Sequence, residues 1–243
     1  MIGDIKTVFW KEWQEIMVWG GARGKLGILL LAGVFGIFLP LQSGRGWVET
    51  PAVLIYWTWV PLFLVSSVIA DAFAGERERH TLETLLASRL SDRAILLGKF
   101  AAAVAYGVSI AWLCLLLGLV IVNLVHGAGE LLLYPLNVAV GIVALTLLGA
   151  GLSAGAGVLV SLRASTVRQA QQTLSIAIML LLFVPVFGFQ ALPDEWKMHL
   201  AEQFVNLAVT RVIVIASLLL VALNVGLLAA ATGRFRRARL ILD

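Results

Sequence analysis

Charged residues and cysteine are both scarce in this sequence of 243 residues. Asp, Glu, Lys and Arg together make up 13% of it, about half the share found in soluble domains, whereas hydrophobic residues make up 60%. This balance excludes a soluble globular domain, and the high hydrophobicity also excludes a disordered chain. The single cysteine, Cys114, cannot form an intramolecular disulfide or a zinc site built on paired cysteines.

Several motifs for catalysis and ion binding are also missing from the sequence. Gly24-Lys25 and Gly98-Lys99 are the only Gly-Lys pairs, and each is followed by an apolar residue where a phosphate loop needs Ser or Thr. No group of histidines and carboxylates has metal-ligand spacing. No acidic residue lies in the middle of an apolar run, which argues against a carrier driven by protons or sodium ions. The sequence therefore predicts no catalytic residue, no metal site and no cofactor on this chain.

What the sequence does contain is a series of long apolar runs. A helix needs about 20 mostly apolar residues to cross the hydrocarbon layer of a membrane. Six runs qualify, and we therefore expect an all-α membrane protein with six transmembrane helices. The runs extend over Leu26 to Gln42, Ala52 to Ala72, Phe100 to Leu124, Leu136 to Leu162, Leu174 to Leu192 and Val209 to Thr232.

The basic residues between these runs alternate clearly from one side to the other. Of the 18 Lys and Arg residues, only Arg45, Lys197 and Arg211 fall on the second side. Cytoplasmic loops of membrane proteins are enriched in Lys and Arg. We therefore expect a multi-pass protein of the cell (inner) membrane with both termini in the cytoplasm.

Two amphipathic helices are predicted outside the spans. In residues 1–24, apolar residues recur at helical spacing, and the tryptophans among them suit the level of the lipid headgroups. In residues 193–204, a proline at the start, acidic residues in the first turn and apolar residues four apart predict a short helix on the outer surface. We expect both helices to belong to one transmembrane domain, residues 1–243.

The cytoplasmic loop of residues 73–99 is the most informative stretch. It predicts two short helices, the first with Thr81 as N-cap and Glu83 in its first turn, the second capped by Ser91 and leading into the third span. The first helix carries an apolar stripe of Leu82, Leu85 and Leu86. Such a stripe must be buried, either against the protein's own inner surface or against a separate subunit.

At these residues the chain resembles a known family. Phe73 to Ser88 reads FAGERERHTLETLLAS, and the run from Ser91 to Lys99 ends in ILLGK. Together they resemble the signature of the ABC-2 type transporter permeases, which are the membrane subunits of ATP-driven exporters. One departure is His80, a position at which the family commonly has Gly, and it concerns the turn before Thr81.

The resemblance implies a mechanism and a set of partners. Two permease subunits, identical or different, would associate with two cytoplasmic ATPase subunits that hold ATP and magnesium, and would move a substrate across the lipid bilayer by alternating access. The loop after the second span would carry a coupling helix that docks on the ATPase. No nucleic-acid partner is expected. The implied coupling residues are Glu76, Arg77, Glu78, Arg79, Thr81, Leu82, Glu83, Leu85 and Leu86.

A serine within the fourth span offers an alternative function. Residues 151–155 match the G-x-S-x-G pattern of a hydrolase nucleophile, so an intramembrane serine hydrolase built on Ser153 is one alternative, and a membrane scaffold that transports nothing is another. The pattern lies in a predicted membrane helix rather than after a strand. We favour close helix packing, because small residues recur every four positions at Gly149, Ser153, Gly157 and Ser161.

Polar residues are few within the spans. Asn123, Asn137 and Asn224 are the clearest, and each has two interpretations. A polar side chain at membrane depth is a candidate for contact with substrate, but it equally suits a hydrogen bond between neighbouring helices. The substrate itself, the identity of the ATPase and the choice between a homodimer and a heterodimer are not encoded in any motif.

Overall fold

The computed structural model describes residues 1–19, 21–198 and 208–235, and every regular element that it describes is a helix. The expected all-α fold class is therefore confirmed. In chain order the helices are α1 (Ile2–Trp19), α2 (Gly21–Leu31), η1 (Ala32–Phe38), α3 (Leu39–Ser43), α4 (Gly46–Glu49), α5 (Val53–Glu78), α6 (Leu82–Ala87), α7 (Asp92–His126), α8 (Leu136–Ser161), α9 (Val167–Gln190) and α11 (Val209–Arg234).

Six helical segments are long and apolar enough to cross a membrane, as the sequence predicts. The first, Leu26–Ser43, is continuous through α2, the π-helical segment η1 and α3, and α5, α7, α8, α9 and α11 form the others. The 35 residues of α7 give it a length of roughly 50 Å, which exceeds the hydrocarbon thickness of about 30 Å. Helix α7 is therefore longer than the apolar layer is thick.

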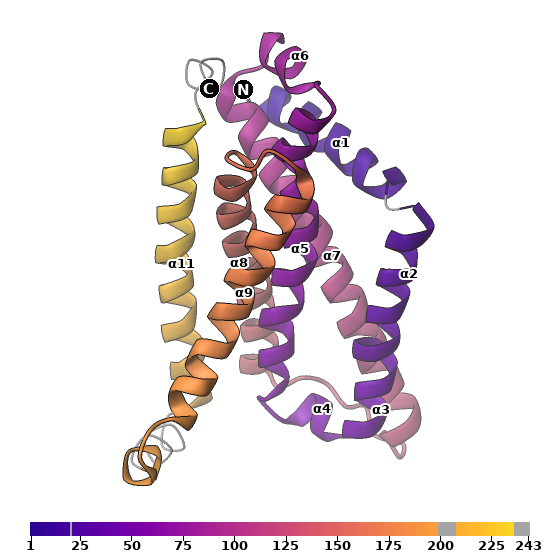
Figure 1. The fold of residues 1–243 in the computed structure, drawn as a ribbon. Helices are drawn as coiled ribbons and strands as arrows, with labels where there is room; N and C mark the ends of the chain where they lie inside the picture. The colour runs from indigo at the N-terminus through magenta and orange to yellow at the C-terminus, as the bar shows by residue number, and fades with distance from the viewer. Residues whose placement is uncertain (20, 199–207, 236–243) are drawn as a thin grey trace.

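The two ends of the bundle differ in what they carry (Figure 1). The helices α1 and α6 and the last described turns of α11 lie at one end, and α3 and α4 lie at the other. This arrangement is the one that an even number of crossings requires. At the α3 end, Arg45 donates to the carbonyls of His126 and Gly127 at 3.1 and 3.3 Å and so joins the turn after α3 to the end of α7.

The centre of the bundle is the contact between α5 and α8, where small residues allow the two helices to approach closely. A Cβ atom at Gly149 would lie 2.8 Å from the carbonyl oxygen of Thr58, and one at Gly157 would clash with Ile69. Ser153 donates to the carbonyl of Leu62 at 2.8 Å. Ser161 donates to Ala70 at 2.9 Å and accepts from two backbone amides of α5, those of Phe73 and Ala74.

A proline within α5 explains another contact with α8. Pro61 has no N–H, so the carbonyl of Trp57, four residues earlier, lacks its usual helical donor. The hydroxyl of Thr146, which is fully buried on α8, donates to this carbonyl at 3.2 Å and also lies 2.5 Å from the carbonyl of Ile142 on its own helix. A carbonyl without a donor is costly where no water is present, so Thr146 stabilises the proline within the span.

The two helices predicted outside the spans have different bounds in the structure. The N-terminal helix α1 ends at Trp19 rather than at residue 24, and residues 21–24 already belong to α2. Its most buried residues are Val8 and Glu12, whereas Phe9 and Trp13 are only half-buried and stack on each other. In the outer segment predicted over residues 193–204, residues 194–198 are helical, and residues 199–204 lie outside the described residues.

Candidate functional site

The candidate coupling segment begins where α5 ends, at a turn centred on His80. The N–H of Thr81 donates to the carbonyl of Glu76 at 2.9 Å, and the N–H of His80 donates to that of Arg77 at 3.1 Å. These two bonds form a Schellman motif, which requires the residue after the C-cap to adopt a left-handed conformation. His80 has a φ of 56°. This geometry explains why glycine suits the position, since a side chain disfavours positive φ.

Helix α6 turns the first residue of its leucine stripe toward the permease itself. Leu82 is 8% exposed and belongs to the apolar core, and Leu85 packs half-buried against that core. The side chain of Leu86 lies outside the described part of the structure. Glu83 is exposed on α6. Leu82 therefore lies inside the permease, and the exposed side chains described on α6 are those of Glu83, Thr84 and Ala87.

Thr81 occupies the N-cap position of α6, but its side chain does not cap the helix. The hydroxyl contacts the carboxylate of Glu76 and also lies 3.3 Å from the carbonyl oxygen of the same residue. Thr81 is therefore the N-cap residue of α6, as predicted, but its side chain makes no capping hydrogen bond, because its hydroxyl contacts the buried carboxylate of Glu76. The predicted cap of α7 is confirmed, since Ser91 accepts from the N–H of Ala94 at 3.3 Å.

Two charged residues at the end of α5 hold the turn between α8 and α9. Arg77 donates to the carbonyls of Ala164 and Leu162 at 2.7 and 2.9 Å, at the C-terminal end of α8. The carboxylate of Glu78 accepts from the N–H of Val167 at 3.1 Å, at the first residue of α9. Each charge has the sign that suits its helix end. These two residues therefore tie the end of α5 to both neighbouring helices.

Glu76 lies at a charged junction between α1, α5 and α7. The ammonium group of Lys99 on α7 lies 2.7 Å from the carboxylate of Glu12 on α1 and 3.2 Å from that of Glu76 on α5. Lys99 is 3% exposed, Glu76 is 5% exposed and Glu12 is 8% exposed. Lys99 also lies over the ring of Phe73, 5.7 Å from its centroid. Glu76 is therefore placed inside the permease and not on a surface rim.

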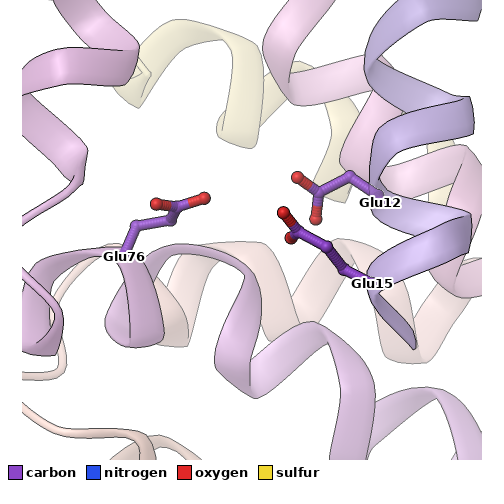
Figure 2. A group of neighbouring side chains, drawn as sticks. All are labelled: Glu12, Glu15 and Glu76. Atoms are coloured by element: carbon purple, nitrogen blue, oxygen red, sulfur yellow. The ribbon is translucent and has the colours of Figure 1, made fainter. Parts of the chain in front are cut away.

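Figure 2 shows the carboxylates of Glu12, Glu15 and Glu76 directed toward one another, the first two from α1 and the third from α5. The three groups lie within 4.8 Å of one another, as in a site for a metal ion. Two ammonium groups already balance two of the three negative charges, because Lys11 lies 3.1 to 3.3 Å from all three carboxylates and Lys99 contacts two of them. The cluster is accordingly an ion-pair network within the protein.

The network also affects Lys11, which is about half exposed. Burial opposes its charge, but the carboxylates of Glu12 and Glu76 and the hydrogen-bonded Glu15 outweigh that effect and raise the pKa of Lys11 above its usual value of 10.5. Lys11 therefore stays charged throughout the physiological pH range. The junction therefore includes two cations, Lys11 and Lys99, and both lie next to carboxylates.

A glycine on α7 brings α1 close enough for this junction to form. A Cβ atom at Gly98 would lie 2.6 Å from Val8 of α1 and 3.2 Å from the carbonyl oxygen of Ile5. The next residue on α7 is Lys99, which meets Glu12 one turn beyond Val8 on α1. The close contact at Gly98 thus sets the distance across which the ion pairs form.

A cavity of about 860 Å³ borders the network. Its wall includes Lys11, Glu12 and Ile16 from α1, and Thr84 and Leu85 from α6. Deeper in the bundle it is lined by Ser67, Val68 and Ala72 of α5 and by Ala103 and Tyr106 of α7. Helix α6 therefore faces α1 across open space, next to the ion pairs.

The other predicted site residues take part in contacts between helices. The amide of Asn224 on α11 donates to the carbonyl of Leu148 on α8 at 3.0 Å. Asn123 exchanges hydrogen bonds with the backbone of Leu132, at 2.7 and 2.9 Å, in the segment that follows α7. Asn137 is exposed in the first turn of α8.

Ser153 is 3% exposed, and its hydroxyl is engaged by α5. The described histidines, His80 and His126, lie at helix ends, and His199 is outside the described residues. Ser153 therefore takes part in a contact between helices. Its hydroxyl bonds to a backbone carbonyl and, among the described residues, not to a side chain that could act as a general base.

Sequence reasoning missed the partners of Glu76. Lys99 was counted as one of the basic residues that set orientation, and Glu12 was assigned no role. The available signal was the position of Lys99 between apolar residues, in the run ILLGKFAAA at the start of the third span. A charge within such a run needs a partner. The two partners could not be identified, because Glu12 and Glu76 lie 87 and 23 positions earlier in the chain and on different helices.

Comparison with protein families gives one match, and it agrees with the resemblance noted in the sequence. The family model described as ABC-2 family transporter protein matches residues 63–212, which is more than half of the chain. The match includes the end of α5, all of α6 and Lys99, and it ends within α11. The comparison with curated proteins found no match.

Proposed function

The chain belongs to the ABC-2 family of transporter proteins, and on that premise we propose that it is the membrane subunit of an ATP-driven exporter. It is a multi-pass membrane protein of a transport family. We assign ATP binding to separate subunits, because the sequence contains no phosphate-binding loop of the G-x-x-x-x-G-K-[ST] type. In this proposal two copies of the permease, or this chain and a related one, associate with two ATPase subunits.

The observation that carries the proposal is the set of contacts made by the charged run at the end of α5. Glu76 contacts α1 and α7, Arg77 holds the end of α8, and Glu78 holds the start of α9. Helix α6 follows this run directly and presents Glu83 to the exterior. A force applied to α6 would therefore reach four other helices through polar contacts.

These contacts suggest that different residues of the coupling segment have different roles. We propose that the ATPase binds the outward face of α6, at Glu83 together with the exposed residues Ala87 and Arg89. Leu82 and Leu85 hold α6 on the permease, and Glu76, Arg77 and Glu78 transmit its displacement. Alternating access then results when the ATPase pair closes and moves the two α6 helices.

The end that carries α1 and α6 would face the cytoplasm. Basic residues gather at this end, among them Arg77, Arg79, Arg89, Arg93 and Lys99, whereas the opposite connections contain Arg45, Lys197 and Arg211. Of the three asparagines, Asn137 stays a candidate for substrate contact because its side chain is exposed, while Asn123 and Asn224 bond to backbone carbonyls.

The test is retention of ATP-binding subunits by the detergent-solubilised permease. Each ATP-binding subunit encoded near the gene is expressed with the tagged permease, and the amount that co-purifies is measured. Glu83→Lys should reduce retention, because a reversed charge opposes the complementary charge of a partner. Glu130→Lys is the matched control, since Glu130 is exposed at the opposite end of the bundle.

Two results would count against the proposal in different ways. If the wild-type permease retains none of the ATP-binding subunits, the function itself is wrong. If Glu83→Lys retains as much as the wild type and Glu130→Lys, the ATPase does not bind the outward face of α6.

A further inference from the structure

The contacts of Lys99 differ from those of the other cations at the α6 end of the described structure. Its ammonium group is almost completely buried and lies between two carboxylates that come from different parts of the fold, Glu12 of α1 and Glu76 at the end of α5. Arg77 also makes hydrogen bonds to other elements, but it is only partly buried and bonds to backbone carbonyls of a single turn. Lys99 joins α1 and α5 to α7 from a buried position, whereas Lys11, which also contacts Glu12 and Glu76, is about half exposed.

The position of the cavity makes this link important for α6. Thr84 and Leu85 of α6 and Glu12, Glu15 and Ile16 of α1 line the same cavity from different helices. Space therefore separates much of α6 from α1. The base of α6 is connected to α1 through Thr81, whose hydroxyl contacts Glu76, and through the ion pairs from Glu76 by way of Lys99 and Lys11 to Glu12.

We propose that Lys99 is a positioning residue that links α1 to the base of α6, so that a displacement of α6 moves the interfacial helix α1 and the long span α7 together. The inference rests on the proposed function for the source of that displacement. It also adds to it, because α1 thereby becomes a moving part of the transport cycle instead of a passive anchor on the membrane surface.

Ion pairs of a lysine suit a link between helices that move relative to each other. A lysine ammonium group has three donors on a flexible stem, so it keeps hydrogen bonds to two carboxylates while their directions change. Tight packing of side chains allows no comparable change, because the atoms have no free space. Here the cavity provides space beside the ion pairs, and Gly98 keeps α1 and α7 in contact one residue before Lys99.

The distance between α1 and α6 in the reconstituted permease tests the proposal directly. Spin labels are attached to cysteines placed at Met17 on α1 and Ala87 on α6, both exposed, in a background in which the buried Cys114 is replaced by Ala. The wild type should give one narrow distance distribution. Lys99→Met should broaden it and shift it to longer distances, and Lys99→Arg should preserve it.

A second variant separates positioning from folding. Glu12→Gln, Glu76→Gln and Lys99→Met together remove the buried charges, and such neutral replacements of a buried ion pair are often tolerated without loss of stability. This triple variant should melt close to the wild type yet still show the broadened distribution. Arg45→Met, at the opposite end, should leave the distance unchanged. A wild-type distribution in both Lys99→Met and the triple variant would overturn the proposal.

The role in coupling is measured on the complex with the ATP-binding subunit. Lys99→Met should retain that subunit, because the outward face of α6 is intact, but should lose the stimulation of ATP hydrolysis by the permease. Loss of retention together with stimulation would indicate a merely structural role and would contradict the proposal. If the wild type binds no ATP-binding subunit, the proposed function fails, whereas the distance measurement still decides whether Lys99 links α1 to α6.

Discussion

Helix α5 makes two kinds of contact, and they contrast sharply. Along its length it packs against α8 through small residues and neutral hydrogen bonds, at Gly149, Ser153, Gly157 and Ser161. At its end it meets α1 and α7 through ion pairs that border a cavity. At the first contact a Cβ atom at Gly149 or Gly157 would clash, and the second contact has a cavity of about 860 Å³ beside it.

One helix therefore makes two mechanically different contacts. We call the close-packed contact of α5 with α8 the frame, and the ion-paired contact of Glu76 with α1 and α7 the joint. Close packing fixes the distance between two helices, because any displacement produces a clash or a void. An ion pair fixes only the separation of two charged groups, and so it tolerates rotation of the helices that carry them. We infer that α5 and α8 move as one body, while α1 and α6 adjust their positions around it.

The largest effect that we expect concerns Glu76, a buried member of the junction, and Glu15, its half-buried neighbour. Glu76→Gln should destabilise the permease by about 3 kcal/mol, because it removes one partner of a buried ion pair. Glu15→Gln should cost roughly 0.3–0.5 kcal/mol, since Glu15 pairs with Lys11 at the surface with spacing i, i+4. Chemical unfolding of the detergent-solubilised protein measures both. Equal effects would mean that burial does not distinguish the two carboxylates.

Overpacking of the frame should have the next largest effect. Gly157→Leu places a side chain where a Cβ atom alone clashes with Ile69, and such a change typically costs about 1–3 kcal/mol. Gly226→Leu is the matched control on α11, because nothing lies within 4 Å of its Cβ position. Adding Ile69→Ala to Gly157→Leu should recover part of the loss. If Gly157→Leu and Gly226→Leu melt alike, the α5–α8 contact is not tightly packed.

A smaller effect concerns the carbonyl that Pro61 leaves without its helical donor. Thr146→Val removes the hydroxyl that donates to Trp57, and we expect a loss of about 1–2 kcal/mol. In a Pro61→Ala background the helical N–H is restored, so the same substitution should cost little. Thr58→Val is the control, because Thr58 bonds only within its own helix, to Leu54. Equal costs in both backgrounds, measured by the same unfolding assay, would contradict the assignment.

The frame was predictable from the sequence, and the joint was not. The spacing of Gly149, Ser153, Gly157 and Ser161 places small residues on one face of a helix, and this pattern is local. The six spans follow from equally local apolar runs. The Lys99 network depends on residues from three helices, and no periodicity within one helix reveals which carboxylate a buried lysine meets.

The coupling segment shows the same limit at the level of single residues. The sequence correctly predicts a short helix after Thr81 and the cap at Ser91, but the second helix is the start of α7 and not a separate short helix. It does not reveal which face of the first helix is buried, because the helix has only six residues, of which three are leucines and one is charged. In the structure the side chain of Leu82 is buried, that of Glu83 is exposed, and the carboxylate of Glu76 lies inside the protein.

A smaller effect than at Thr146 is expected at His80, in the turn between α5 and α6. Its φ of 56° is a conformation that glycine adopts without steric cost, so His80→Gly should stabilise the permease by about 0.5–1 kcal/mol. Ala177→Gly, at an exposed interior position of α9, should instead destabilise it by about the same amount, because glycine weakens a regular helix. Both changes are measured by chemical unfolding in detergent. Stabilisation at His80 would show that the turn into α6 carries backbone strain in the natural sequence. Destabilisation by His80→Gly as large as that of Ala177→Gly would mean that contacts of the histidine side chain stabilise the permease by more than its positive φ destabilises it.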